Sequence, residues 1–196
     1  MVKTKICGLS RIEDIDTINS QKPDYIGFVF AESRRKITPQ HALKLRHLLH
    51  PNIIPVGVFV DEQVENIMAI VKSGAIDMVQ LHGSEDEAYI QKLKLLIDQP
   101  IIKAISVQNK GDVQKWNQTT ADYLLLDHQG GGTGTCFDWH LIGEVEKPFF
   151  LAGGLHAQNV GKAIKEIRPF AVDVSSGVET NGVKDSKKII AFMRRR

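Results

Sequence analysis

A carboxylate ends a short apolar segment in the second half of the chain, where Asp127 follows three consecutive leucines. Burial beside such a run disfavours the charged form of a carboxyl group. It therefore raises the pKa and allows the group to donate a proton near neutral pH. Asp127 is a candidate general acid. A role as a cap of the local turn is an equally good interpretation from the spacing alone.

A lysine and a cysteine share one face of the first apolar segment. Side chains alternate along a β-strand, so Lys5 and Cys7 point to the same side. An ammonium group favours the thiolate, and we expect Lys5 to lower a cysteine pKa that starts near ~8.5. Cys7 is thus a candidate for proton chemistry. The alternative is a small buried hydrophobic residue.

Two turns rich in glycine and serine predict an anion site near the C-terminal end of the chain. Gly153 and Gly154 follow one apolar segment, and Ser175, Ser176 and Gly177 follow the next. Glycines allow the backbone to approach a phosphate closely, and backbone N–H groups with serine hydroxyls can bind it. Two ordinary turns are the competing interpretation.

Other polar residues also follow apolar segments. Arg34, Arg35 and Lys36 form a basic loop in which an arginine could bind a carboxylate bidentately, although such runs are usually solvated. Gln80 and His82 share a face at the end of another segment. His82 is as well suited to a hydrogen bond with a loop as to proton transfer.

The elements that would position these residues alternate regularly. Eight short runs rich in β-branched residues are predicted to be strands, and each precedes a segment with helical periodicity. The predicted strands cover residues 3–6, 25–30, 54–59, 77–81, 101–105, 123–126, 149–152 and 171–174. This inventory predicts an α/β fold of the (β/α)8 TIM-barrel type. The main rival is an open doubly wound sheet, but the first strand lacks the glycine-rich fingerprint of that fold.

A closed barrel has two consequences for the candidate residues. Function belongs at the C-terminal ends of the strands, where all of these side chains would gather. The eighth strand would also pair with the first, which places Asp173 beside Lys5 inside the barrel. An unpaired charge there would be costly, so we predict that these two side chains are neighbours.

Composition restricts the classes of protein that fit. The length of 196 residues predicts one compact domain over residues 1–196, and a net charge of +2 gives no reason to expect a nucleic-acid partner. Two cysteines, no signal peptide and no membrane-spanning run suggest a cytoplasmic protein without disulfides. The histidines lack metal-ligand spacing, so we expect no metal. We expect a monomer, with a homodimer as the alternative. The glycine-rich residues 130–134 are interpreted as a cover over the site.

Taken together, the motifs resemble those of the phosphoribosylanthranilate isomerase family along the whole chain. The matching motifs are Lys5-Ile6-Cys7-Gly8, Gly27-Phe28-Val29-Phe30, Ser33-Arg34-Arg35, Gln80-Leu81-His82-Gly83, Leu126-Asp127, Gly131-Gly132-Thr133-Gly134, Phe137-Asp138-Trp139, Gly153-Gly154-Leu155 and the run 170–179. The last of these is the most specific.

The resemblance implies an Amadori rearrangement of N-(5-phosphoribosyl)anthranilate without a cofactor. It implies that Asp127 is the general acid that protonates the ribose ring oxygen, and that Cys7 is the general base that removes the C2′ proton. It further implies that Arg35 holds the anthranilate carboxylate and that the two glycine-containing loops hold the phosphate. The substrate, a phosphosugar joined to anthranilate, is thus inferred from resemblance.

Two other functions fit part of the pattern. The histidine-pathway isomerase family runs the same type of reaction, but it carries an aspartate where Cys7 stands here and has a second phosphate site. A phosphate-binding barrel without catalysis would need neither Cys7 nor Asp127. Both alternatives therefore fit the sequence less well.

Overall fold

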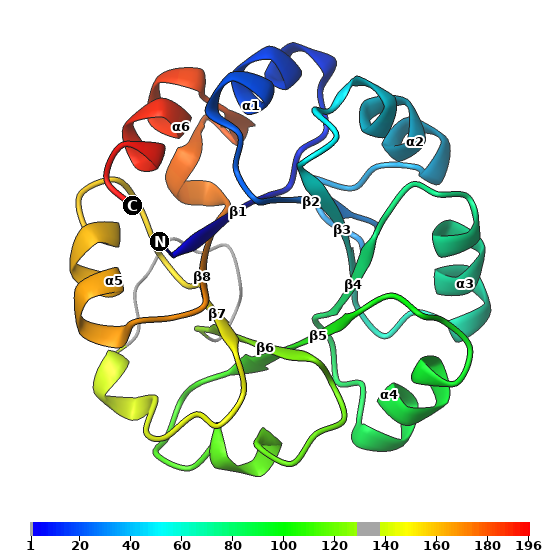
Figure 1. Cartoon of the computed structure of the whole chain (residues 1–196), viewed down its shortest axis with the longest axis vertical. Coiled ribbons are helices and arrows are strands. Elements are labelled where there is room, and N and C mark those ends of the chain that lie inside the picture. The colour runs from blue at the N-terminus through cyan, green and yellow to red at the C-terminus, as the bar shows by residue number, and fades with distance from the viewer. Residues whose placement is uncertain (1, 129–137) are drawn as a thin grey trace.

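The computed structural model describes residues 2–128 and 138–196, and its strands form a closed parallel barrel in the order β1 to β8. Figure 1 shows the helices arranged around the outside of these strands. The barrel strands are β1 Lys3–Cys7, β2 Tyr25–Val29, β3 Ile54–Phe59, β4 Met78–Leu81, β5 Ile101–Ser106, β6 Tyr123–Asp127, β7 Phe149–Leu151 and β8 Ala171–Val174. Each begins and ends within one residue of the predicted range. The predicted barrel is confirmed.

Six α-helices lie in the described part of the chain, and they follow six of the eight strands. They are α1 Ile15–Gln21, α2 Pro39–Leu48, α3 Val64–Lys72, α4 Glu87–Lys94, α5 Val160–Ile167 and α6 Ser186–Met193. The Thr38 hydroxyl caps α2 by accepting a hydrogen bond from His41 N, and Pro39 occupies the first turn. None of the helices in the described ranges is long and apolar enough to cross a membrane.

The expectation of a helix after every strand is wrong in detail. Among the described residues, β5 and β6 are followed by the short 3-10 helices η2 Gln114–Trp116 and η3 Trp139–Leu141. The segment after β5 contains asparagine, glycine and adjacent threonines, which are poor helix formers. These residues favour turns and local hydrogen bonds over a continuous helix.

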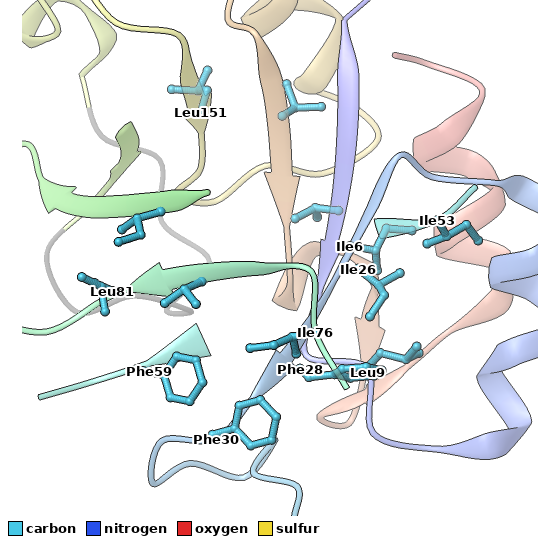
Figure 2. Close-up of a cluster of buried hydrophobic side chains, with 14 of the residues drawn as sticks. Ile6, Leu9, Ile26, Phe28, Phe30, Ile53, Phe59, Ile76, Leu81 and Leu151 are labelled. Atoms are coloured by element: carbon cyan, nitrogen blue, oxygen red, sulfur yellow. The ribbon is translucent and has the colours of Figure 1, made fainter. Parts of the chain in front are cut away.

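The apolar residues form two layers, as a barrel requires. The larger cluster fills the space between the strands and the helices, and Figure 2 shows part of it around Ile6, Ile26, Phe28 and Leu81. The smaller cluster fills the barrel interior. Its buried members are Tyr25, Val56, Met78, Ile102, Ala104, Leu125, Phe150, Ala152 and Ala171. The interior is thus a packed core that leaves room for chemistry at its end.

The pairing of β8 with β1 closes the barrel and carries the predicted ion pair. Lys5 is in register with Asp173, and its Nζ donates to both carboxylate oxygens at 3.1 Å. Lys5 is 0% exposed, so the bidentate contact provides the counter-charge that burial demands. The prediction that these side chains are neighbours is confirmed.

A small hairpin between β8 and α6 was not predicted. It consists of β9 Glu179–Thr180 and β10 Val183–Lys184, which pair antiparallel. Asn181 and Gly182 form its turn, and both have positive φ angles. An Asn-Gly pair is the strongest short-range signal for such a turn. The signal was therefore present in the sequence.

Candidate active site

A cavity of about 260 Å³ opens at the C-terminal end of the barrel. It is lined by Cys7, Val29, Ala31, Glu32, Ser33, Arg35, Val58, Val60, Gln80, His82, Asp127, Asp173 and Ser175. Residues from six strands and from the loop after β2 therefore converge on one space. Seven of the side chains identified from the sequence line this cavity: Cys7, Arg35, Gln80, His82, Asp127, Asp173 and Ser175. Lys5 lies below them and is bound to Asp173.

Asp127 is the carboxylate whose environment differs most from water. Burial raises its pKa to about 6, against an opposing hydrogen bond from His128 N to Oδ1 at 2.7 Å. Asp173 adds to the increase, whereas Lys5 opposes it. About one Asp127 side chain in ten is then protonated at pH 7. The predicted rise in the pKa of Asp127 is confirmed, and its role as general acid stays a prediction.

This raised pKa has a measurable cost in stability. The folded state holds the Asp127 proton more tightly than the unfolded chain does. The protonated Asp127 side chain therefore contributes its full stabilisation of the folded state at low pH. This contribution is lost as pH rises through about 6. We expect Asp127→Asn to raise the free energy of unfolding by about 1–3 kcal/mol at pH 7.5 and to change it little at pH 4. Urea unfolding at both pH values measures this difference. An equal effect at both would contradict the desolvation argument.

His82 lies next to Asp127 but does not stabilise its charged form. Its Nε2 is 3.7 Å from Asp127 Oδ2, which is longer than a hydrogen bond. Burial lowers the pKa of His82, and the positive charge of Lys5 lowers it further. The imidazole is therefore neutral at neutral pH. Gln80 Nε2 donates to His82 Nδ1 at 2.7 Å, and this contact fixes the ring. Gln80 and His82 thus form a neutral wall of the cavity.

The environment of Cys7 corrects one expectation. Lys5 does lower the pKa of the thiol, and Lys184 does so as well, but burial outweighs both and raises the pKa overall. Sequence analysis identified the lysine but could not weigh it against burial. The thiol is consequently protonated in the resting state. A base at this position must lose its proton to form the reactive thiolate.

Arg35 reaches the cavity from the loop after β2, but an internal carboxylate is its partner. Its Nε donates to Glu179 Oε1 at 2.7 Å and its NH2 donates to Glu179 Oε2 at 2.9 Å. This bidentate pairing raises the pKa of Arg35, so the guanidinium stays charged. The arrangement leaves a fixed cation at the edge of the cavity.

The loops after β7 and β8 lie against each other. A Cβ on Gly177 would come within 1.9 Å of Leu155 O, so this close approach requires glycine. Gly153 and Gly154 both have positive φ angles in the adjoining turn. Ser176 and Gly177 belong to the short 3-10 helix η4, Ser176–Val178. The two predicted loops therefore form one contiguous structure, as an anion cradle would need.

Ser175 differs from Ser176 and Gly177 because it lines the cavity at the end of the barrel. Its hydroxyl donates to Cys7 O at 3.1 Å, and Lys184 Nζ donates to Ser175 O at 3.1 Å. Ser175 also lines the cavity with Cys7 and Asp127. The serine thus links the predicted phosphate loop to the strand that carries the thiol.

Sequence reasoning assigned no role to Glu179 and Lys184, which form a buried pair at 2.7 Å beside Arg35. The Asn-Gly turn between them was the available signal. The proposed cover at residues 130–134, and Cys136, lie outside the described residues. Within the described ranges, no group of three or more potential metal-binding side chains is close enough to hold an ion.

Comparison with known proteins gives a consistent result along the whole chain. A model of the family "N-(5'phosphoribosyl)anthranilate (PRA) isomerase" matches residues 4–195. The N-(5'-phosphoribosyl)anthranilate isomerase of Endomicrobium trichonymphae is 50% identical over 198 residues, covering 99% of this chain and 98% of that protein. The corresponding protein of Thermoanaerobacter pseudethanolicus is 46% identical, with 100% and 98% coverage.

Solved structures agree with the sequence comparison. The phosphoribosyl anthranilate isomerase of Thermus thermophilus superposes with a TM-score of 0.90 at 30% identity, covering 99% of this chain and 98% of that one. A phosphoribosyl anthranilate isomerase in complex with reduced 1-(o-carboxyphenylamino)-1-deoxyribulose 5-phosphate gives a TM-score of 0.86 at 37% identity, with 100% and 98% coverage.

The barrel and the polar groups at its C-terminal end define a (β/α)8-barrel enzyme that acts on a small molecule. The matched residues 4–195 span every motif on which the sequence-based resemblance rested. The chain belongs to the N-(5'-phosphoribosyl)anthranilate isomerase family. This is an aldose–ketose isomerase family of tryptophan biosynthesis.

Proposed function

We propose that this chain isomerises N-(5-phosphoribosyl)anthranilate with Asp127 as general acid and Cys7 as general base. The observation that carries this assignment is the placement of both side chains on one cavity, together with Arg35 and Ser175. Both groups are buried, and their pKa values are raised. A raised pKa makes Asp127 a proton donor near neutrality and makes the Cys7 thiolate strongly basic once formed.

The resemblance to the isomerase family supplies the order of the proton transfers. Asp127 protonates the ribose ring oxygen, the C1′–O bond breaks, and the anilino nitrogen supplies the electron pair that forms the Schiff base. The Cys7 thiolate, formed when the thiol loses its proton to solvent, then removes the C2′ proton. The C–H electrons form the C1′=C2′ double bond of an enolamine, and the electron pair of the C1′=N bond returns to the anilino nitrogen. Transfer of the enol proton to C1′ gives the ketone. Substrate and product contain the same atoms, and proton exchange with solvent returns a proton to Asp127 and removes one from Cys7 before the next turnover.

The charged groups around the cavity are assigned to binding. Arg35 binds the anthranilate carboxylate, and Gly153, Gly154, Ser176 and Gly177 bind the phosphate through backbone N–H groups and a hydroxyl. Ser175 contributes from the cavity side. Lys5 and Asp173 form the floor, where the 3.1 Å ion pair fixes the inward face of β1 beneath the thiol.

Formation of product from freshly prepared phosphoribosylanthranilate tests the activity. We expect the fluorescence of the substrate to fall with time and with enzyme concentration, without any added metal or cofactor. The same assay with the aminoaldose substrate of the histidine pathway tests the second candidate. Turnover of that substrate alone would assign the chain to the other reaction.

The cellular and quaternary setting also belongs to the proposal. We place the enzyme in the cytoplasm, as its composition predicts, and as a monomer. A solved relative from Thermotoga maritima is described as a dimeric enzyme from which monomers were generated. A homodimer is therefore the defined alternative, and sedimentation equilibrium of the purified chain distinguishes the two.

A further inference from the structure

The β9–β10 hairpin places one carboxylate among three cations at the edge of the cavity. Glu179 Oε2 accepts from Arg34 NH2 at 2.8 Å and from Arg35 NH2 at 2.9 Å. Its Oε1 accepts from Arg35 Nε and Lys184 Nζ, each at 2.7 Å. The Glu179 side chain is 4% exposed, so these contacts are shielded from solvent. Such charge-assisted hydrogen bonds hold their partners in defined orientations.

The charges of this cluster do not cancel. Arg34, Arg35 and Lys184 carry one positive charge each, and Glu179 carries one negative charge, which leaves an excess of two. Of the three cations, Arg35 is the one that lines the cavity. An excess of positive charge at the cavity edge suits an anionic group on the ligand.

The contacts of Arg35 define which part of its guanidinium faces the ligand. A guanidinium has five N–H donors in a planar fork. In the described part of the chain, its side-chain hydrogen bonds run from Nε and NH2 to Glu179, and the NH1 edge lies opposite. The NH1 edge can therefore bind a ligand carboxylate while Glu179 holds the other side.

The aliphatic part of the Arg35 side chain packs closely against the backbone at Gly8. Its Cδ lies 2.4 Å from where a Cβ on Gly8 would be, so the side chain crosses the chain immediately after Cys7. Gly8 also has a φ of 82°, which favours glycine. Gly8 thus restricts the aliphatic part of the Arg35 side chain, and Glu179 restricts its guanidinium.

We propose that Glu179 is a positioning residue for substrate recognition, which orients Arg35 so that its NH1 edge meets the carboxylate of the bound anthranilate group. The inference rests on the proposed function, since it assigns a carboxylate to the ligand. Without Glu179 the three cations repel one another, and Arg35 is freed to adopt other rotamers. Affinity for the carboxylate then falls, although a negative charge has been removed.

Binding of two synthetic ligands tests this role. One is reduced 1-(o-carboxyphenylamino)-1-deoxyribulose 5-phosphate, and the other is the same compound with an unsubstituted phenyl ring. We expect Glu179→Gln to weaken binding of the carboxylated ligand about tenfold and binding of the phenyl ligand less than about twofold. Glu179→Asp retains the charge and should recover part of the loss. Arg34→Gln is the matched control, because Arg34 contacts Glu179 outside the cavity, and it should change neither ligand by more than about twofold.

Each other outcome has a definite meaning. Equal weakening of both ligands would overturn the proposal and make Glu179 a structural residue. Tighter binding of the carboxylated ligand would overturn it too, because Glu179 would then compete with substrate for Arg35. If Glu179→Gln does not fold, Glu179→Asp carries the test, with selective weakening of the carboxylated ligand expected. Turnover by the wild type is measured separately, so failure of the activity and failure of this positioning role are distinguishable.

Discussion

Asp127→Asn should reduce kcat by two to four orders of magnitude while leaving binding of the reduced product analogue nearly unchanged. Asparagine keeps the size and polarity of the side chain but has no acidic proton to donate to the ribose ring oxygen. General acid catalysis typically contributes about 10²–10⁴-fold to a rate, which sets the expected loss. Single-turnover measurements and calorimetric titration with the reduced analogue give the two quantities separately.

The control for this substitution is Asp98→Asn, which makes the same chemical change at an exposed position outside the cavity. We expect it to change kcat by less than about twofold. If Asp127→Asn lost affinity for the analogue as strongly as it lost activity, Asp127 would be a binding residue. The turn-cap interpretation would then regain support, because Asp127 Oδ1 does accept the N–H of His128.

The arrangement of the barrel was predictable because it depends on local patterns. Every strand of the barrel is a short apolar run with clear boundaries, so the eight strands could be placed to within one residue. Closure then determined which strands are neighbours. This is why Lys5 and Asp173, which are 168 positions apart, could be paired from the sequence.

The features that were missed depend on competition between effects. The pKa of Cys7 results from burial acting against two lysines, and a sequence does not give the depth of burial. The contact of Arg35 with Glu179 joins residues 144 positions apart through a hairpin that was not recognised. Its Asn-Gly turn was a usable local signal, whereas the four-charge cluster depends on tertiary packing.

Cys7→Ser should also reduce kcat by about two to four orders of magnitude, because a hydroxyl is a far weaker acid than a thiol. Little alkoxide exists at neutral pH, even beside Lys5, so the C2′ proton loses its acceptor. Serine is slightly smaller than cysteine and polar, and the midpoint of thermal unfolding should move by only a few degrees. A fully active Cys7→Ser enzyme would refute the assignment of the thiolate as base.

An isotope effect separates the role of Cys7 from that of Asp127. With substrate deuterated at C2′, the Cys7→Ser enzyme should show a larger isotope effect on kcat than the wild type, because proton abstraction becomes the slow step. Asp127→Asn should show a smaller one, because ring opening precedes C–H cleavage and limits the rate. Opposite shifts in the two variants follow from an acid and a base that act in sequence. A shift in the same direction in both would mean that the two side chains serve one step.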